Sequence, residues 1–284
     1  MIISIASGKG GTGKTTIATN LAFSLGENVQ LLDCDVEEPN SHLFLKPEIK
    51  EEIPVIAPIP LIDEDKCTYC KKCMEICRFG AIAVMAETIL TFPELCHSCG
   101  GCIAVCPEKA VSEMKRELGK IEKGNLDLID FVGGRLKVGE VMAPPIIKAV
   151  RAHEKKECIN IVDAPPGTSC PVIASMKNAD FILLVTEPTP FGLNDLKLAV
   201  EAVKILDIPA GLVINRAGMG NDDVKKYAEK ENLPILMEIP FDRKIAETYS
   251  KGDLVVNAMP EWKEKFLDVY KQIKSMIEQR SQNR

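Results

Sequence analysis

The stretch Ser7-Gly8-Lys9-Gly10-Gly11-Thr12-Gly13-Lys14-Thr15-Thr16 decides the fold of this 284-residue chain. An apolar run over residues 1–6 precedes it, and a helix-forming run over residues 17–25 follows it. The stretch fits GxxxxGK[ST] between a strand and a helix, a pattern in which backbone N–H groups of the glycine-rich turn surround phosphate groups. A glycine-rich turn without a ligand is the alternative, and the flanking strand and helix argue against it.

Two side chains of this turn add charge and metal chemistry. Lys14 places a positive charge beside the phosphates, and the Thr15 hydroxyl is positioned to bind Mg²⁺. The sequence therefore predicts a site for ATP with Mg²⁺ that is formed by Gly8, Gly10, Gly11, Thr12, Gly13, Lys14, Thr15 and Thr16.

Strand-like and helix-like runs alternate in the second half of the chain. Strands are expected over residues 159–163, 181–186, 211–215 and 235–239, and helices over 145–156, 193–206 and 222–231. This alternation predicts an α/β fold, a mostly parallel sheet covered by helices on both faces. A final helix over 261–279 places Trp262, Phe266, Val269, Ile273 and Met276 or Ile277 on one face. We expect that face to dock on the sheet, with membrane contact as the alternative.

Eight of the eleven cysteines fall into two runs of identical spacing. The runs are Cys67-x2-Cys70-x2-Cys73-x3-Cys77 and, 29 residues later, Cys96-x2-Cys99-x2-Cys102-x3-Cys106. The repeat extends to Ala81-Ile82, which recurs as Ala110-Val111. Structural zinc is the alternative, but zinc sites use two CxxC pairs well separated in sequence, and neither run leaves that gap.

The spacing of the two runs resembles that of bacterial ferredoxins with two [4Fe-4S] clusters. The resemblance implies that three cysteines of one run and the last cysteine of the other hold each cluster. The sets are Cys67, Cys70, Cys73 and Cys106 for the first cluster, and Cys96, Cys99, Cys102 and Cys77 for the second. One departure is that Arg78 follows the first run where Pro107 follows the second; its charge would raise the reduction potential of the nearer cluster.

The cysteine runs interrupt the nucleotide-binding domain. We expect residues 60–117 to form an inserted α+β ferredoxin-like domain, and residues 1–59 and 118–284 to form a discontinuous P-loop ATPase domain. Pro54, Pro58 and Pro60 predict an extended lead-in to the insert. Residues 118–143 predict a hairpin around Gly133-Gly134 that returns the chain to the ATPase.

Residues 9–15, KGGTGKT, resemble the deviant Walker A motif of the MinD/Mrp ATPases, relatives of the nitrogenase iron protein. In that family the early lysine reaches across a dimer interface to the partner's nucleotide. The resemblance therefore implies that Lys9 is catalytic and that the protein is a homodimer around ATP. A solvated surface lysine is the alternative reading of Lys9.

Other positions match the family in chain order. The segment Asp33-Cys34-Asp35 is similar to the first switch, which implies that Asp35 lies near the attacking water; a turn-forming aspartate is the alternative. Residues 163–168, DAPPGT, resemble the Walker B and second-switch motif. There Asp163 would hold Mg²⁺ through water and the Gly167 N–H would sense the γ-phosphate. The resemblance also implies that Asn215 reads the base edge and that Pro240 packs on the ring. The implied catalytic residues are Lys9, Lys14, Asp35 and Asp163.

Composition limits the classes of partner. The chain is 46% hydrophobic, has mean hydropathy +0.03, and carries a net charge of -6 with a pI near 5.4. An acidic chain is not expected to bind nucleic acid, and no stretch approaches a membrane span. With no export signal and cysteines spaced for metal, we expect a reducing cytoplasm. Cys34 and Cys158 are expected in the core. Cys170 is either a buried helix-start residue or a bridging, redox-active residue of the dimer.

The combined resemblance covers the whole chain and implies an ATP-hydrolysing homodimer. Its nucleotide state would gate electron transfer through two [4Fe-4S] clusters to or from a partner protein that the sequence does not identify. A regulatory module, in which the clusters sense redox state, is one alternative. An iron-sulfur or metallocofactor assembly factor is another, although the region after Asn215 lacks the CxxC with which the Mrp branch bridges its dimer.

Overall fold

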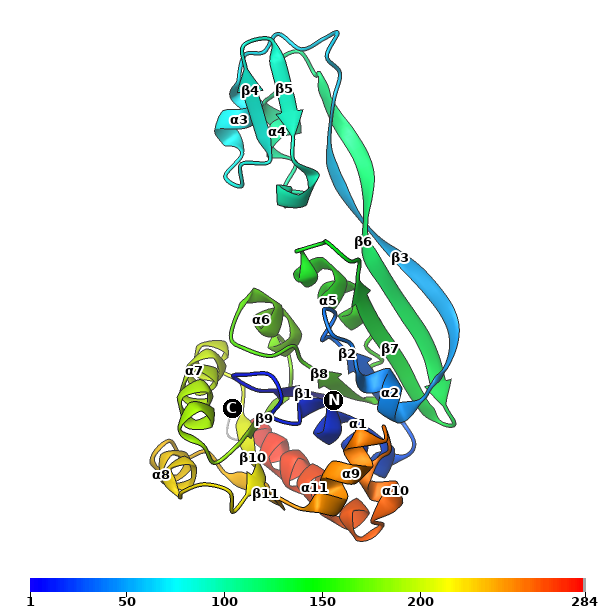
Figure 1. Ribbon diagram of the computed structural model, residues 1–284, viewed down its shortest axis with the longest axis vertical. Helices are drawn as coiled ribbons and strands as arrows, with labels where there is room; N and C mark the ends of the chain where they lie inside the picture. Colours follow the sequence, from blue (N-terminus) through cyan, green and yellow to red (C-terminus); the bar gives the residue numbers. More distant parts are fainter. Residues whose placement is uncertain (283–284) are drawn as a thin grey trace.

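A nine-stranded sheet runs through the main body of the computed structural model, which describes residues 1–282 (Figure 1). The strand order is β11-β10-β9-β1-β8-β2-β7-β6-β3. Strands β1, β2 and β7 to β11 run parallel to one another. Strands β6 and β3 are antiparallel to their neighbours. The bounds are β1 Ile2–Ala6, β2 Val29–Asp33, β3 Glu48–Ile62, β6 Val111–Leu126, β7 Ile129–Leu136, β8 Ile159–Asp163, β9 Phe181–Thr186, β10 Ala210–Ala217 and β11 Ile235–Pro240.

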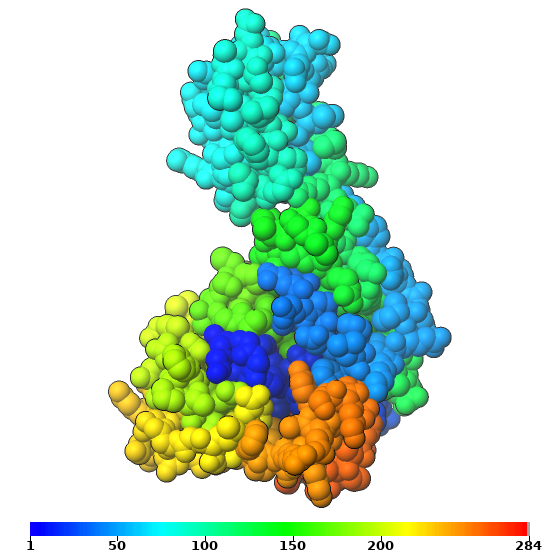
Figure 2. All heavy atoms as spheres, viewed as in Figure 1, coloured from blue at the N-terminus to red at the C-terminus, as the bar shows by residue number. Residues whose placement is uncertain are grey.

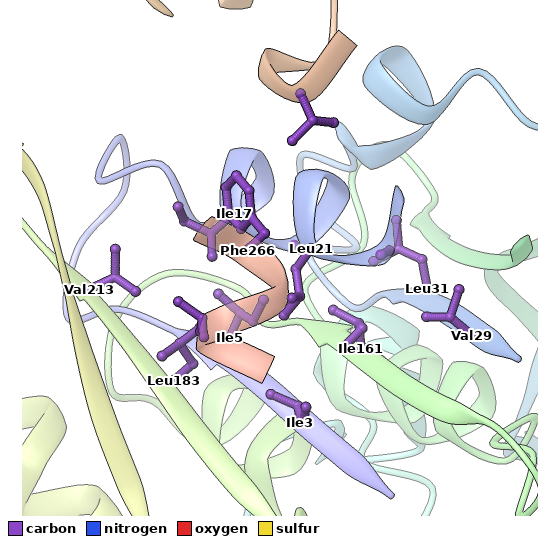
Figure 3. Close-up of a cluster of buried hydrophobic side chains, with 14 of the residues drawn as sticks. Ile3, Ile5, Ile17, Leu21, Val29, Leu31, Ile161, Leu183, Val213 and Phe266 are labelled. Atoms are coloured by element: carbon purple, nitrogen blue, oxygen red, sulfur yellow. The ribbon is translucent and has the colours of Figure 1, made fainter. Parts of the chain in front are cut away.

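Helices cover both faces of this sheet. On one face lie α1 (Lys14–Leu25), α2 (Ser41–Leu45), α9 (Arg243–Ser250), α10 (Val255–Ala258) and α11 (Glu261–Gln282); on the other lie α5 (Ala143–Arg151), α6 (Cys170–Met176), α7 (Pro190–Leu206) and α8 (Asp223–Lys230). Figure 3 shows Ile3, Ile5 and Leu183 of the sheet beside Ile17 and Phe266 of the helices. The expected α/β fold is confirmed.

Helix α11 docks on the sheet through the face that the sequence predicts. Trp262, Phe266, Val269 and Ile273 are buried in the same core as β1 and α1, with Met276 and Ile277 packed at its margin. Because these side chains are covered by protein, the apolar face of α11 is not available to a lipid surface. Within residues 1–282, every helix is too short or too polar to cross a bilayer.

The expected hairpin is present, but its turn was placed wrongly. Strands β6 and β7 turn at residues 127–128, where Asp127 has φ 48°. Gly133 and Gly134 lie inside β7 instead. A Cβ at Gly134 would stand 2.6 Å from Val36 and 2.8 Å from Val150, so Gly134 allows the segment after β2 and helix α5 to approach the strand closely.

Strands β3 and β6 continue beyond the sheet as a two-stranded stalk (Figure 1). Residues 111–118 of β6 pair with β3 alone, because β7 ends at Leu136, opposite Gly119. Pro54, Pro58 and Pro60 all lie on β3, the edge strand, where a missing N–H costs no ladder hydrogen bond. The extended lead-in inferred from these prolines is thus a long strand.

Residues 63–110 form a small lobe at the end of the stalk, drawn in cyan apart from the body in Figure 2. It contains α3 (Lys72–Ile76), the hairpin β4 (Ile82–Met85) and β5 (Thr88–Thr91), a 3-10 turn (Pro93–Leu95) and α4 (Gly101–Val105). The 29-residue sequence repeat recurs in the backbone: α4 lies 29 residues after α3. The N–H of Asp63 bonds to the carbonyl of Ala110, and that of Phe92 to Ala81, both at 2.8 Å. The 29-residue repeat relates position 63 to 92 and position 81 to 110. It therefore converts each of these two bonds into the other, as a pseudo-twofold axis requires.

Candidate functional site

The glycine-rich turn opens onto a cleft of about 370 Å³ at the carboxyl ends of the parallel strands. Helix α1 begins at Lys14, which is 5% exposed, and Gly13 precedes it at φ 97°. A Cβ at Gly13 would lie 2.5 Å from the Asn215 amide nitrogen, so only glycine fits there. The residues of the turn that line the cleft are Gly10, Gly11, Gly13, Lys14, Thr15 and Thr16; Gly8 and Thr12 lie behind them. This is a cradle of N–H groups and one ammonium at a helix N-terminus, suited to phosphate.

Two buried aspartates lie side by side behind the turn. Asp33 of β2 and Asp163 of β8 are register partners, and both are fully buried. Asp163 accepts hydrogen bonds from the Ser41 hydroxyl at 3.0 Å and from Thr15, while its Oδ1 has no hydrogen-bond partner in the described chain. Burial raises the pKa of Asp163, and the charge of Lys14 opposes that rise. An unpartnered buried carboxylate oxygen beside a threonine hydroxyl is a donor set that suits Mg²⁺.

Asp35 is the third carboxylate, and it lines the cleft. Burial and the charge of Asp163 raise its pKa to about 7, although Lys14 acts in the opposite direction. A carboxylate with a pKa near neutrality can exchange a proton with water at physiological pH. Asp35 begins the segment 35–40, here called the switch segment, which ends at α2.

Lys9 does not line the cleft and is paired within its own chain. Its Nζ lies 3.2 Å from Oε2 of Glu187, a carboxylate at the end of β9 whose side chain is 7% exposed. Arg216 binds the other oxygen of Glu187 at 2.7 Å. Lys9 is therefore paired rather than simply solvated. Glu187 was missed from the sequence because its relation to Lys9 exists only in the folded sheet.

The far end of the cleft is apolar and aromatic. Pro240 and Phe241 line it together with Tyr249, Trp262 and Phe266. The sequence predicted only Pro240 at this end of the site. The periodicity of the last helix predicted Trp262 and Phe266 as core residues, and both also line the cleft. A flat apolar end of this kind suits a nucleoside base.

Two groups that were expected to contact the nucleotide make hydrogen bonds within the protein instead. Asn215 lines the cleft, and its amide donates to the Thr12 carbonyl at 2.8 Å. The Gly167 N–H donates to the Ser7 carbonyl at 3.0 Å, in a residue with φ 98°. Pro166, next to Gly167, lines the cleft.

The lobe contains two hollows, and the eight repeat cysteines divide between them. The first, here called the stalk pocket, is lined by Cys77, Cys96, Cys99 and Cys102, and by residues 58–60 and Glu113 of the stalk. The second, the tip pocket, is lined by Cys67, Cys70, Cys73 and Cys106, and by residues at the very end of the stalk, Ile62 and Val111. These are the two sets that the ferredoxin resemblance implies.

Backbone geometry around the sulfur atoms repeats as well. The N–H of Ala81 donates to Cys77 Sγ at 3.3 Å, and that of Ala110 to Cys106 Sγ at 3.2 Å. Such bonds stabilise a thiolate. In residues 1–282 no three His, Cys, Asp or Glu side chains stand together as a site for one metal ion. A four-iron cluster makes a different demand, because each of its irons takes its own cysteine around a central volume. Four cysteines around one hollow fit that demand.

The base of the stalk is bonded to the switch segment. The N–H of Leu136 donates to the carbonyl of Val36 at 2.8 Å, and the N–H of Lys137 to Leu118 of β6. Three residues on, Glu140 receives two hydrogen bonds from Arg116 of β6, at 2.6 and 2.9 Å. Arg116 also lies 3.9 Å from Glu94 of the lobe. A continuous set of contacts thus joins the nucleotide cleft, the stalk and the lobe.

The three cysteines outside the repeats differ in exposure. Cys34 is fully buried, and burial raises the pKa of its thiol, as expected for a core residue. Cys158 is only half-buried, just before β8, so its placement in the core was wrong. Cys170 begins α6 as expected but is exposed, which corrects the expectation that a helix-start cysteine there would be buried.

Comparison with known proteins agrees with this architecture. A family model for the CobQ/CobB/MinD/ParA nucleotide binding domain matches residues 3–255. An uncharacterized protein of Methanocaldococcus jannaschii is 35% identical over 264 residues, covering 89% of this chain and 90% of that protein. An iron-sulfur cluster carrier protein of Aquifex aeolicus is 28% identical over 303 residues, covering 98% of this chain and 68% of the carrier.

A solved structure adds the likeness of fold. The septum site-determining protein MinD of Pyrococcus horikoshii, complexed with Mg-ADP, has a TM-score of 0.59 to this chain at 21% identity, covering 97% of this chain and 96% of that one. The glycine-rich turn, the aspartate behind it and the match over most of the chain lead to one conclusion. This chain belongs to the CobQ/CobB/MinD/ParA family of nucleotide-binding domains, a P-loop family that binds ATP.

Proposed function

We propose that this protein is an ATP-hydrolysing homodimer that couples its nucleotide state to electron transfer, through two [4Fe-4S] clusters, with a partner protein. Residues 60–117 would be an inserted two-cluster ferredoxin domain, and residues 1–59 with 118–284 the ATPase domain. The observation that carries the proposal is the division of eight cysteines between two hollows, four to each, on a stalk that is bonded to the switch segment.

At the nucleotide, each residue has a role that its position supports. The N–H groups of the turn and Lys14 bind the phosphates. Thr15, and Asp163 through water, hold Mg²⁺, which offsets phosphate charge when bound. Asp35 orients the attacking water and accepts its proton, a task suited to a pKa of about 7. Asn215 and Pro240 bind the base.

In the dimer, Lys9 would exchange one anionic partner for another. Within one chain it is paired with Glu187, and Arg216 shares that carboxylate. When two copies meet around ATP, Lys9 would leave Glu187 for the phosphates of the other copy, and Arg216 would keep the buried carboxylate neutralised. The Gly167 N–H would turn from Ser7 toward the γ-phosphate.

In the lobe, each set of four cysteines would hold one cluster, which supplies a one-electron redox centre when bound. The N–H groups of Ala81 and Ala110 donate hydrogen bonds to the sulfur atoms of Cys77 and Cys106, a kind of contact that tunes an iron-sulfur cluster. Movement of the switch segment on ATP binding would reach the stalk through Val36 and Leu136, and the stalk would then move the lobe.

The test measures ATP hydrolysis by anaerobically purified protein, with dithionite-reduced and then with oxidised clusters, while the cluster spectrum is followed. We expect hydrolysis to depend on the redox state, or the reduction potentials to move when ATP binds. Hydrolysis rates that do not depend on the redox state, together with reduction potentials that do not change when ATP binds, would overturn the coupling.

Cysteine variants test the pairing separately. Cys106→Ser and Cys77→Ser should each lose about half of the bound iron, because each removes one of two four-iron clusters. Cys158→Ser is the matched control, since Cys158 lies outside both hollows, and should keep all of it. If Cys170→Ser leaves the iron content of the dimer unchanged, Cys170 does not bridge a shared cluster.

A second candidate function is cluster assembly or delivery, with the clusters sensing redox state. The relative from Aquifex aeolicus that is named an iron-sulfur cluster carrier protein favours it. Rapid transfer of a cluster from this protein to an apo-acceptor would support delivery. Retention of both clusters in the presence of the acceptor would support electron transfer.

A further inference from the structure

The two halves of the lobe repeat in backbone but not in charge. Positions 71, 72 and 109 are lysines, whereas the equivalent positions of the other half, 100, 101 and 80, are glycines. Lys71 and Lys72 line the tip pocket, and Lys109 adjoins it, between Glu108 and Ala110, which line it. All three glycines belong to the stalk pocket or adjoin its wall.

Two of these lysines occupy a backbone conformation that favours glycine. Lys71 has φ 65° and Lys109 has φ 53°, close to the 71° of Gly100 and the 66° of Gly80. A residue with a Cβ pays about 1 kcal/mol to adopt this left-handed conformation. Glycine satisfies the same turn in the other half without that cost, so the turn itself does not require a lysine.

The three ammonium groups are exposed and uncommitted. Within residues 1–282, none of Lys71, Lys72 and Lys109 has an ion-pair partner, whereas nearby Lys66 is bound to Asp63. Glu108 is the one carboxylate among the described residues that line the tip pocket. Four exposed carboxylates lie outside that lining: Glu64 and Asp65 before Cys67, Glu75 in the first turn of α3, and Glu87 between β4 and β5. Charge compensation of a bound cluster would not need three lysines, because the stalk pocket would hold the same kind of cluster with Arg78 after Cys77 and glycines at the three equivalent positions.

We propose that Lys71, Lys72 and Lys109 form a docking surface for an acidic electron-carrier protein, and that the tip pocket is where electrons enter or leave. The stalk pocket is lined by residues 58–60 and Glu113 of the stalk, and its cluster would be the inner one of the two. The inference rests on the proposed function, since it assigns the two hollows different places on one electron path. Complementary charge would steer the partner to the tip of the lobe.

The repeat supplies its own matched variants for a test. Lys71→Gly/Lys72→Gly/Lys109→Gly gives the tip pocket the residues that the other half already tolerates. Gly100→Lys/Gly101→Lys/Gly80→Lys moves the same charges to the stalk pocket. A Cβ at Gly80 or Gly100 would meet nothing within 4 Å, and one at Gly101 would lie 3.6 Å from Ile76, an ordinary contact.

The readout is equilibrium binding, measured by titration calorimetry on cluster-loaded protein. The probes are a small acidic ferredoxin and a basic c-type cytochrome, each at low and at high salt. We expect the lysine-to-glycine variant to bind the ferredoxin about 10-fold more weakly at low salt, with the difference vanishing at high salt, and to bind the cytochrome no more weakly. The glycine-to-lysine variant should not gain a comparable affinity.

Three outcomes would overturn the surface: unchanged affinity for the ferredoxin, a loss that is equal at both salt concentrations, or an equal gain when the lysines are moved to the stalk pocket. A shift in reduction potential without a change in binding would assign the lysines to tuning a cluster and would also overturn docking. Iron analysis keeps the proposed function separate. Protein purified without iron would contradict that function. Cluster-loaded protein whose affinity for the ferredoxin does not depend on the lysines would contradict only this inference.

Discussion

The body and the lobe are stabilised in different ways. The body surrounds β1 with buried apolar side chains from strands on both sides and helices on both faces, and its polar site residues are fixed by that core. The lobe has 48 residues from 63 to 110, and its buried apolar cluster contains only Cys73, Ile82, Val84 and Ile89. A core this small rarely stabilises a domain without metal or cross-links. The body thus folds around its own side chains, whereas the lobe, under the proposed function, would fold around its two clusters.

Removal of iron should therefore separate the two regions. After anaerobic chelation, we expect residues 63–110 to exchange their amide hydrogens as an unfolded segment, because the binding free energy of the metal is part of their folding free energy. Residues 1–45 and 143–282 should keep their protection and their affinity for ATP. Amide protection of residues 63–110 that persists after chelation would contradict a lobe that depends on metal for its folding.

The reverse experiment removes the nucleotide site and keeps the lobe. Lys14→Ala should lower ATP hydrolysis by about 100-fold or more, because the ammonium beside the phosphates is lost, while iron content stays unchanged. Lys9→Ala is the matched variant: it should still bind ATP as a monomer but fail to hydrolyse it. Equal loss of binding in both variants would contradict the separate role of Lys9.

The contact between the two regions can be weakened on its own. Arg116→Ala leaves Glu140, whose side chain is 8% exposed, without the two hydrogen bonds that its Oε1 accepts. We expect a loss of about 3 kcal/mol in the free energy of unfolding, measured by urea denaturation. Lys123→Ala, on the same strand and in an exposed pair with Glu51, should cost much less. Similar losses would show that Glu140 is not held by Arg116.

The smallest expected effect is a pH dependence of the body without nucleotide. The pKa of Asp35 is raised to about 7, so the folded protein keeps a proton that the unfolded chain releases near pH 4. Stability contributed by this group is therefore lost as the pH rises from about 4 to 7. Asp35→Asn should raise the free energy of unfolding by on the order of 2 kcal/mol at pH 8 and by much less at pH 5. A gain that is the same at both pH values would contradict the shift.

The sequence predicts local patterns well and relations between distant residues poorly. The glycine-rich turn and the face of α11 follow from spacing alone, because their periods are those of the elements that carry them. Gly133-Gly134 was misread because a glycine pair serves tight packing as readily as a turn, and only the neighbouring Val36 and Val150 decide between them. The pairs Lys9 with Glu187 and Arg116 with Glu140 join residues 178 and 24 positions apart, which no spacing rule connects.

The unsupported part of the stalk acts as a lever arm. From Val111 to Leu118 the ribbon has only two strands, which corresponds to a reach of about 24 Å at 3.4 Å per residue. A rotation of about 10° at its base, where Leu136 is bonded to Val36, would move its tip by about 4 Å on that reach. Electron tunnelling falls exponentially with distance. A movement of this size at the tip would therefore change the rate of electron transfer between the proposed clusters and a docked partner without altering either cluster.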